Sequence, residues 1–313
     1  MITLLLIPLV MPWALLPLAR RTVGLVRPGI ALWGVTCATA ALAVGVVASL
    51  GALLLPIALA LPPVSALADL IHPLRAGPEL LVLGVSALAA GGLALATSRV
   101  LLKGASERVR LRAARARVAG LPSAGGLCVL NDPRPDAFAL PGGAHRADRI
   151  VVTTGMLRAL GPVEREVLFA HERAHLSGKH HLFLATAQFA GWCHPALAAV
   201  ATHVSFAAER VADEAAARHC GDRTLAARSV GRAALVAGRD RRAADTPALA
   251  PGVATGPVPA RVKALLTRAP VRCVVPALLA MALVCTTAGA SSLTGAVRLH
   301  RGIEVAQGEH PSD

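Results

Sequence analysis

The sequence predicts a mainly α-helical membrane protein with about four transmembrane helices and an α+β domain inserted between the third and the fourth. The first reason is composition: 55% of the 313 residues are hydrophobic and only 16% are charged, whereas about a quarter of a soluble domain is charged. The second is that four apolar runs are long enough, or nearly so, to cross a bilayer. The third is that residues 103–272, which separate the last two runs, suffice for one domain.

The apolar runs define the membrane region. The first run, at residues 1–19, is followed rather than preceded by arginines, and no small-residue cleavage site comes after it. A signal peptide has the opposite arrangement, so we expect an uncleaved anchor. The second and third runs complete an N-terminal membrane region at residues 1–102. The fourth run gives a span at residues 273–294 and leaves a short tail at residues 295–313.

The distribution of charge predicts the orientation of the chain, whose formal net charge is +14. Basic residues follow the first and third runs and precede the fourth, which is the positive-inside pattern. We therefore expect a multi-pass protein of the cell membrane with residues 103–272 in the cytosol. Both termini and the loop at residues 66–78 then lie outside. Contact with the lipid bilayer explains the basic residues better than nucleic acid does, so no direct nucleic-acid binding is expected.

The first half of the inserted domain contains short predicted elements. The basic segment at residues 106–119 is expected to form a helix along the membrane surface. Short strands are predicted at residues 126–131 and 150–153, and a third is expected at residues 138–140. The six cysteines form no C-x-x-C pair, which agrees with reduced thiols in the cytosol and argues against a cysteine zinc site.

The second half is predicted to be helical. One helix begins at Pro162, because proline suits the first helical position, and Gly178 is a suitable end. Residues 181–207 are apolar with one proline. They fit a buried helical hairpin, a segment that dips into the membrane, or another pair of crossings. A further helix is expected over residues 207–236, followed by a loop rich in proline, glycine and alanine at residues 246–259.

The most informative motif is His171-Glu172-Arg173-Ala174-His175. Side chains four residues apart share one face of a helix, so His171 and His175 can direct two imidazoles at one metal ion. Glu172 can then reach a water on that metal, and this set of groups is what zinc-assisted peptide hydrolysis requires. A chance match in a chain of this length is on the order of one in a hundred. We therefore expect one Zn²⁺ per chain.

Two residues compete to be the third protein ligand. Glu209 and Asp213 lie four apart on a predicted helix, so Glu209 can bind the metal while Asp213 orients a ligand histidine. His181 instead completes the longer H-E-x-x-H-x-x-G-x-x-H signature. That class needs a methionine turn, and the only later methionine, Met281, lies in the predicted fourth span. We therefore favour Glu209 over His181, and we expect His180 and His181 to be solvated.

Five segments follow one another in the same order as in a known group of enzymes. They lie at residues 136–142, 150–157, 167–176, 192–195 and 209–214. Together with the flanking spans they resemble the membrane-bound gluzincin metallopeptidases, particularly the antirepressor peptidases of the BlaR/MecR type. More distantly, the chain is similar to HtpX-like and CAAX prenyl proteases.

The resemblance implies that the inserted domain is a zincin-like metallopeptidase that hydrolyses a protein or peptide substrate, such as a transcriptional repressor. The chain departs from the pattern at Asp136, where the relatives more often have asparagine. It also has only about 20 residues after the last span, where the β-lactam receptors carry a penicillin-binding domain, so antibiotic sensing is not implied. The family pattern assigns the ligands His171, His175 and Glu209, the base Glu172, and the supporting carboxylate Asp213.

Further residues are expected to stabilise the oxyanion or to bind the substrate. Because the chain has no tyrosine, the donor to the oxyanion must be a histidine, an arginine or a backbone amide. His219 and Arg261 are our candidates for this role. Main-chain groups of an edge strand can hold an extended peptide, and the candidates for that strand are Phe138, Ala139 and Leu140.

Two other functions compete with a simple protease. One is a membrane sensor or signal transducer in which proteolysis is the output after an external stimulus. The other is a protein whose zinc site is regulatory or inactive. The intact Glu172 argues against an inactive site, because a scaffold needs the metal ligands but not the base.

Overall fold

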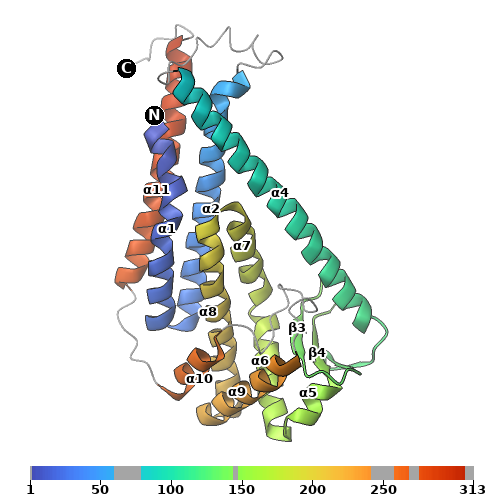
Figure 1. Ribbon diagram of the computed structural model, residues 1–313. Coiled ribbons are helices and arrows are strands. Elements are labelled where there is room, and N and C mark those ends of the chain that lie inside the picture. The colour runs from blue at the N-terminus through green and yellow to red at the C-terminus, as the bar shows by residue number, and fades with distance from the viewer. Residues whose placement is uncertain (1, 60–78, 144–146, 241–256, 268–274, 307–313) are drawn as a thin grey trace.

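This computed structural model describes residues 2–59, 79–143, 147–240, 257–267 and 275–306, so the predicted loop at residues 66–78 and most of that at residues 246–259 lie outside it (Figure 1). Helices dominate the described chain, and one small sheet lies in the inserted part. The elements are α1 (Ile2–Leu25), α2 (Pro28–Leu59), α4 (Glu79–Val118), β1 (Ser123–Ala124), β2 (Leu127–Leu130), β3 (Ala137–Leu140), β4 (Arg149–Thr153), α5 (Thr154–Ala159), α6 (Pro162–Ser177), α7 (His180–Cys193), α8 (Pro195–Cys220), α9 (Arg223–Asp240), α10 (Val258–Leu266) and α11 (Val275–Ala306).

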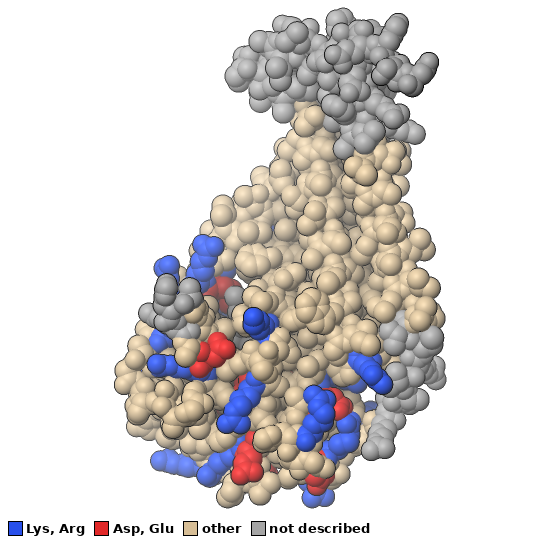
Figure 2. Space-filling model, turned by 180° about the vertical axis from the view of Figure 1, so that it is seen from behind, with Lys and Arg blue, Asp and Glu red and all other residues tan. Residues whose placement is uncertain are grey.

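Among the described residues, four helices are long and apolar enough to cross a membrane, namely α1, α2, α4 and α11. This agrees with the four predicted spans. The helices α1, α2 and α11 pack side by side, around a core that includes Leu15, Val35 and Met281. On the face shown in Figure 2, charged side chains gather over the lower part of the molecule, and the described surface above them is uncharged. An uncharged surface of this kind suits contact with lipid.

Several helix boundaries differ from those predicted, and α11 continues through residues 295–306 of the expected tail. The expected surface helix at residues 106–119 is not separate, because α4 continues without a break from the third span to the sheet (Figure 1). Neither Gly104 nor Ser106 supplies a stop, since glycine lowers helix propensity without ending a helix. The helix expected over residues 207–236 is instead divided at Gly221, whose φ of 71° is the left-handed conformation that closes helices.

Residues 181–207 belong to a helical hairpin, which is one of the three structures that the sequence allowed. Its two arms are α7 and the first half of α8, and they pack against α1 and α2. The arms approach closely near the tip, because a Cβ on Gly191 would lie 2.8 Å from the Cα of Ala198. At the tip, the ring of His194 lies 6.1 Å from that of Trp13 in an edge-on arrangement. Trp13 is in the middle of α1, so the hairpin reaches halfway along the bundle.

The three predicted strands are present as β2, β4 and β3, with β1 added at one edge. The strand order is β1-β2-β4-β3; β2 is parallel to β4, and β3 is antiparallel to it. On one face of the sheet, Phe138 and Leu140 pack against Val118 of α4. On the other, Ala137 belongs to a cluster that contains Leu168 of α6. The alternation of a strand therefore places β3, an edge strand, between α4 and the helix that carries the zinc-binding motif.

Candidate metal centre

The helix α6 presents both motif histidines to the interior. It starts at Pro162, as predicted, and the N–H of its cap residue Gly161 donates to Glu164 Oε2 at 2.8 Å. The apolar face of α6 packs inward. His171 and His175 lie on the same side of the helix, and both side chains are buried. One helical turn separates the two imidazoles, so they project in the same direction.

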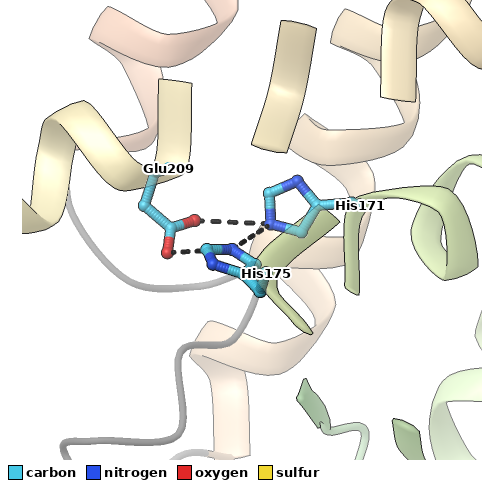
Figure 3. A group of neighbouring side chains, drawn as sticks. All are labelled: His171, His175 and Glu209. Carbon is cyan, nitrogen blue, oxygen red and sulfur yellow. Dashed lines mark hydrogen bonds and ion pairs between the residues drawn. The ribbon is translucent and has the colours of Figure 1, made fainter. Parts of the chain in front are cut away.

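The helix α8 returns beside α6 and brings Glu209 to the two imidazoles (Figure 3). The Nε2 atoms of His171 and His175 are 3.1 Å apart, and each lies 3.5 Å from one oxygen of the Glu209 carboxylate. Tetrahedral zinc with bonds of about 2.05 Å places its ligand atoms about 3.3 Å from one another. The three ligand atoms therefore have the spacing of three corners of a zinc site, and these residues would hold the ion.

Glu172 lies beside this group, with both carboxylate oxygens buried. Neither oxygen has a hydrogen-bond partner among the described residues. Burial raises the pKa of Glu172 to about 8, and the negative charges of Glu209 and Asp136 act in the same direction. A buried carboxylate without a partner is costly, and a water or a cation beside it would satisfy it. The orphaned oxygens therefore fit a site that takes up a metal ion together with its water.

Asp213 and Arg261 surround the ligands with opposite charges. Asp213 Oδ1 is 3.1 Å from Nδ1 of His171, but this nitrogen has no hydrogen-bond partner of good geometry among the described residues. Arg261, which comes from α10 and is fully buried, donates from Nε and Nη2 to Asp213 at 2.8 and 2.7 Å. Its Nη1 lies 2.8 Å from Glu209 Oε2. The guanidinium therefore bridges the two carboxylates and fixes α10 against α8.

These charges determine the protonation of the ligands. Burial alone would lower the pKa of His171, but Asp213 and Glu209 more than offset it and raise that pKa to about 9. Burial holds the pKa of His175 well below its usual value, against the attraction of Glu209. For Glu209, burial works to raise the pKa, while Arg261 and His175 lower it further than burial raises it. The centre therefore has a carboxylate and one neutral imidazole ready to bind a cation, whereas His171 must first lose a proton.

The expectation that His180 is solvated was wrong. Its ring is buried, and its Nδ1 lies 2.9 Å from Nδ1 of His175. The chain can fold back in this way because Lys179 adopts the left-handed φ of 50° and because Gly178 has no side chain. A Cβ on Gly178 would lie 2.5 Å from Nε2 of His180. The spacing of His180 five residues after His175, just past a glycine, was the sequence signal for this contact.

The remaining predicted residues lie at different distances from the centre. His181, the competing ligand, is half-buried beside His180 and is not part of the metal group. His219 is exposed near the end of α8, ten residues beyond Glu209, which corresponds to about 15 Å of helix. In contrast, Arg261 reaches the ligands, and β3 packs against α6. The structure therefore brings Arg261 and the strand that contains Phe138, Ala139 and Leu140 to the centre, but not His219.

Comparison with known proteins agrees with this geometry. Residues 103–198 match the profile of peptidase family M48, and the match covers the end of α4, the sheet, α6 and α7. No curated protein and no solved structure matches the chain. The matched region contains both histidines and Glu172, whereas Glu209 comes from the part of α8 that follows it. The family match supports a zinc metallopeptidase and suggests a membrane-associated one.

Proposed function

We propose that this protein is a membrane-embedded, zinc-dependent endopeptidase that hydrolyses peptide bonds of a protein at the membrane. One observation carries the proposal: two imidazoles and a carboxylate from separate helices place their ligand atoms within 4.8 Å of one another, beside a buried carboxylate that has no hydrogen-bond partner among the described residues. A purely structural metal site would need the converging ligands but not the orphaned carboxylate beside them. The family match at residues 103–198 supports the same activity.

The residues of the centre divide the reaction among them. When bound by His171, His175 and Glu209, zinc would lower the pKa of a water molecule and polarise the substrate carbonyl. Glu172 is the general base, which accepts the proton of the attacking water and passes it to the leaving amine. Before metal binds, burial raises the pKa of Glu172 to about 8, and a bound zinc would lower it again by favouring the ionised carboxylate that acts as the base.

Of the two candidates for stabilising the oxyanion, Arg261 and His219, only Arg261 lies near the metal ligands. Arg261 lies 2.8 Å from Glu209, within the shell around the metal ligands, whereas His219 is exposed farther along α8. Arg261 is held by Glu209 and Asp213, so it would act on the oxyanion only through its charge, as part of this buried charged group. We therefore assign this role to Arg261 and not to His219.

The edge strand β3 is the proposed binding surface for the substrate. It pairs with β4 only, so its outer edge is unpaired within the described sheet. The hydrogen bond from Thr153 N to Asp136 O places residue 136 in a hydrogen-bonded pair. Such pairs alternate in an antiparallel ladder, so the N–H and C=O of Ala139 point outward. An extended peptide can bind there as an added strand, next to Glu172 on α6.

The centre lies at one end of the helical bundle, which favours substrates close to the membrane. Arg210, which follows Glu209 on α8, donates to the carbonyl oxygen of Val23, two residues before α1 ends. The positive-inside pattern supports a cytosolic position for this end. The resemblance to antirepressor peptidases makes a cytosolic repressor one candidate substrate, with the membrane part acting as a sensor.

Replacement of Glu172 by glutamine tests the proposal. We expect Glu172→Gln to keep one zinc per chain and to lower the rate of cleavage by at least about 100-fold, because the general base is lost. The matched control is Glu166→Gln, which changes an exposed glutamate of the same helix and should cleave normally. Quantitative proteomics of cells that express each variant would identify substrates as proteins that accumulate only with Glu172→Gln. Normal cleavage by this variant would exclude the mechanism.

A further inference from the structure

A second cavity lies at the same end of the bundle, on the other side of α8 from the metal centre. Its volume is about 630 Å³, and it is open to the surface. The turn between α1 and α2 forms one wall, α8 forms another, and the start of α9 and the end of α10 close it. It is lined by Gly24, Leu25, Val26, Arg27, Pro28, Gly29, Ile30, Arg210, Val211, Glu214, Arg218, Arg223, Ala264 and Thr267.

The charge of this cavity is strongly positive, with four arginines against one glutamate. The single carboxylate is already neutralised, because Arg223 donates to both oxygens of Glu214. Arg210 donates one hydrogen bond to the carbonyl oxygen of Val23. Arg27 and Arg218 are exposed, and no ion pair engages them within the described chain. At least two guanidinium groups are therefore available to a ligand with negative charge.

An apolar groove continues from the basic cavity along the bundle. Gly29 and Ile30 line both spaces, and the groove extends to Trp33, Gly34 and Leu278 with a volume of about 400 Å³. It therefore follows α2 from its first turn toward the middle of the bundle, with α11 on the other side. Ile30 and Trp33 remain exposed along it. A ligand that fills both spaces must have an anionic group and an apolar chain.

We propose that the cavity and groove bind an anionic phospholipid, with its phosphate at Arg27 and Arg218 and an acyl chain along α2. The direction is that of a lipid in a bilayer: the arginines lie at the end of the spans, and the groove leads from there toward the centre of α2. Basic pockets between membrane helices are suited to such headgroups. A free phosphate would satisfy the arginines but would leave the apolar groove empty.

Such a lipid would contact the elements that support the metal centre without touching the centre. Val211 lines the cavity two residues after the ligand Glu209, and Ala264 lines it three residues after Arg261. The turn between α1 and α2, α8 and α10 would then be joined by one ligand. This inference does not depend on the peptidase activity, because lipid binding can be measured on the protein with or without a substrate.

Lipid binding by the full-length protein in detergent micelles tests the proposal. Native mass spectrometry would count retained lipid during titration with dioleoyl-phosphatidylglycerol, with dioleoyl-phosphatidylcholine, and with inorganic phosphate. We expect the phosphatidylglycerol to bind more tightly than the phosphatidylcholine, and inorganic phosphate to bind far more weakly than either lipid. The double variant Arg27→Gln/Arg218→Gln should bind phosphatidylglycerol about 30-fold more weakly, from roughly 1 kcal/mol for each arginine.

The matched control is Arg20→Gln/Arg21→Gln, which removes the same charge from exposed residues of α1 outside the cavity. This variant should bind phosphatidylglycerol as tightly as the native protein does. A neutral micelle has no charged surface that could attract arginines outside the cavity. Three results would overturn the proposal: no preference of the native protein for phosphatidylglycerol, equal losses in both double variants, or inorganic phosphate binding as tightly as the lipid. The comparison of lipids on the native protein decides the question even if a variant fails to fold.

Discussion

At the scale of single residues, the two ligand histidines are supported by different partners. His171 has the carboxylate of Asp213 at 3.1 Å, whereas His175 has the ring of His180 at 2.9 Å. Either partner can orient an imidazole, because a ring nitrogen that is engaged on one side leaves the other to bind metal. Since Gly178 and Lys179 adopt the geometry that His180 needs, this turn belongs to the centre and is more than a connection between α6 and α7.

Replacing His180 should therefore weaken the centre, although this residue is not a ligand. We expect His180→Ala to lower the affinity for zinc by about 10- to 100-fold, as the loss of an orienting partner does. The visible spectrum of the Co²⁺-substituted protein should change as well, because His175 would be free to rotate. His181→Ala is the control, and its affinity should match that of the native protein. If His181→Ala lost zinc instead, His181 would be the third ligand.

Zinc binding should also depend on pH through His171. In the absence of metal, the carboxylates of Asp213 and Glu209 overcome burial and raise its pKa to about 9, so His171 carries a proton at neutral pH. Zinc must displace that proton. As the pH is raised toward 9, the apparent affinity for zinc should therefore increase by up to about tenfold for each pH unit. Competition with a chelator calibrated at each pH, between pH 6.5 and 9, measures this slope. An affinity that stays constant over that range would contradict the raised pKa.

At the scale of the elements, β3 packs against α6, the helix that carries His171, Glu172 and His175. All four residues of β3 are buried, and α4 and α6 cover the two faces of the strand, so side chains hold it in place. The long α4 is important here, because its last turns supply the surface on which Phe138 and Leu140 rest.

Removing one outward N–H group from β3 tests whether the strand binds the substrate. We expect Ala139→Pro to lower kcat/KM by about 5- to 10-fold, which corresponds to the loss of one hydrogen bond. Proline is tolerated where the N–H does not point toward the neighbouring strand, so zinc content should be retained, and thermal stability is measured alongside because Ala139 is buried. Ala139→Gly keeps the N–H and is the matched control. Equal kcat/KM for the native and proline proteins would show that the substrate does not pair with this residue.

At the scale of the whole molecule, the α7–α8 hairpin joins the catalytic part to the spans. Arg210 contacts α1 near its end, while the hairpin tip contacts Trp13 in the middle of the same helix. Helical rise places residues 194 and 210 about 24 Å apart along α8. Since the hydrocarbon core of a bilayer is about 30 Å thick, the tip should lie deep in the membrane if α1 crosses it.

The depth of the hairpin can be measured with Trp192, one of the three tryptophans of the chain. In a variant with Trp13→Phe and Trp33→Phe, we expect lipids brominated near the ends of their acyl chains to quench Trp192 strongly. Lipids brominated near the headgroup should quench it less, because the tip lies near the centre of the bilayer. Quenching by neither lipid would place the hairpin outside the membrane and would contradict this arrangement of the bundle.

The local elements could be predicted because short-range physical rules govern them. The apolar runs, the strands at residues 126–131 and 150–153, and the start of α6 at Pro162 each depend on hydrophobic pattern or on the conformational limits of one residue. The continuity of α4 was missed because a change in composition is not a helix stop. The break at Gly221 was missed because a glycine has several roles in a helical pattern.

The sequence by itself determined that two histidines and a glutamate would share one turn of helix within a chain rich in apolar runs. Covalent spacing and helical periodicity decide such matters. Only the tertiary structure brought Glu209, and not His181, next to those histidines, buried His180 against His175, and brought Arg261 to Glu209 and Asp213. These contacts join residues that lie on different helices, and their relative positions follow from how the helices pack, which no local pattern encodes.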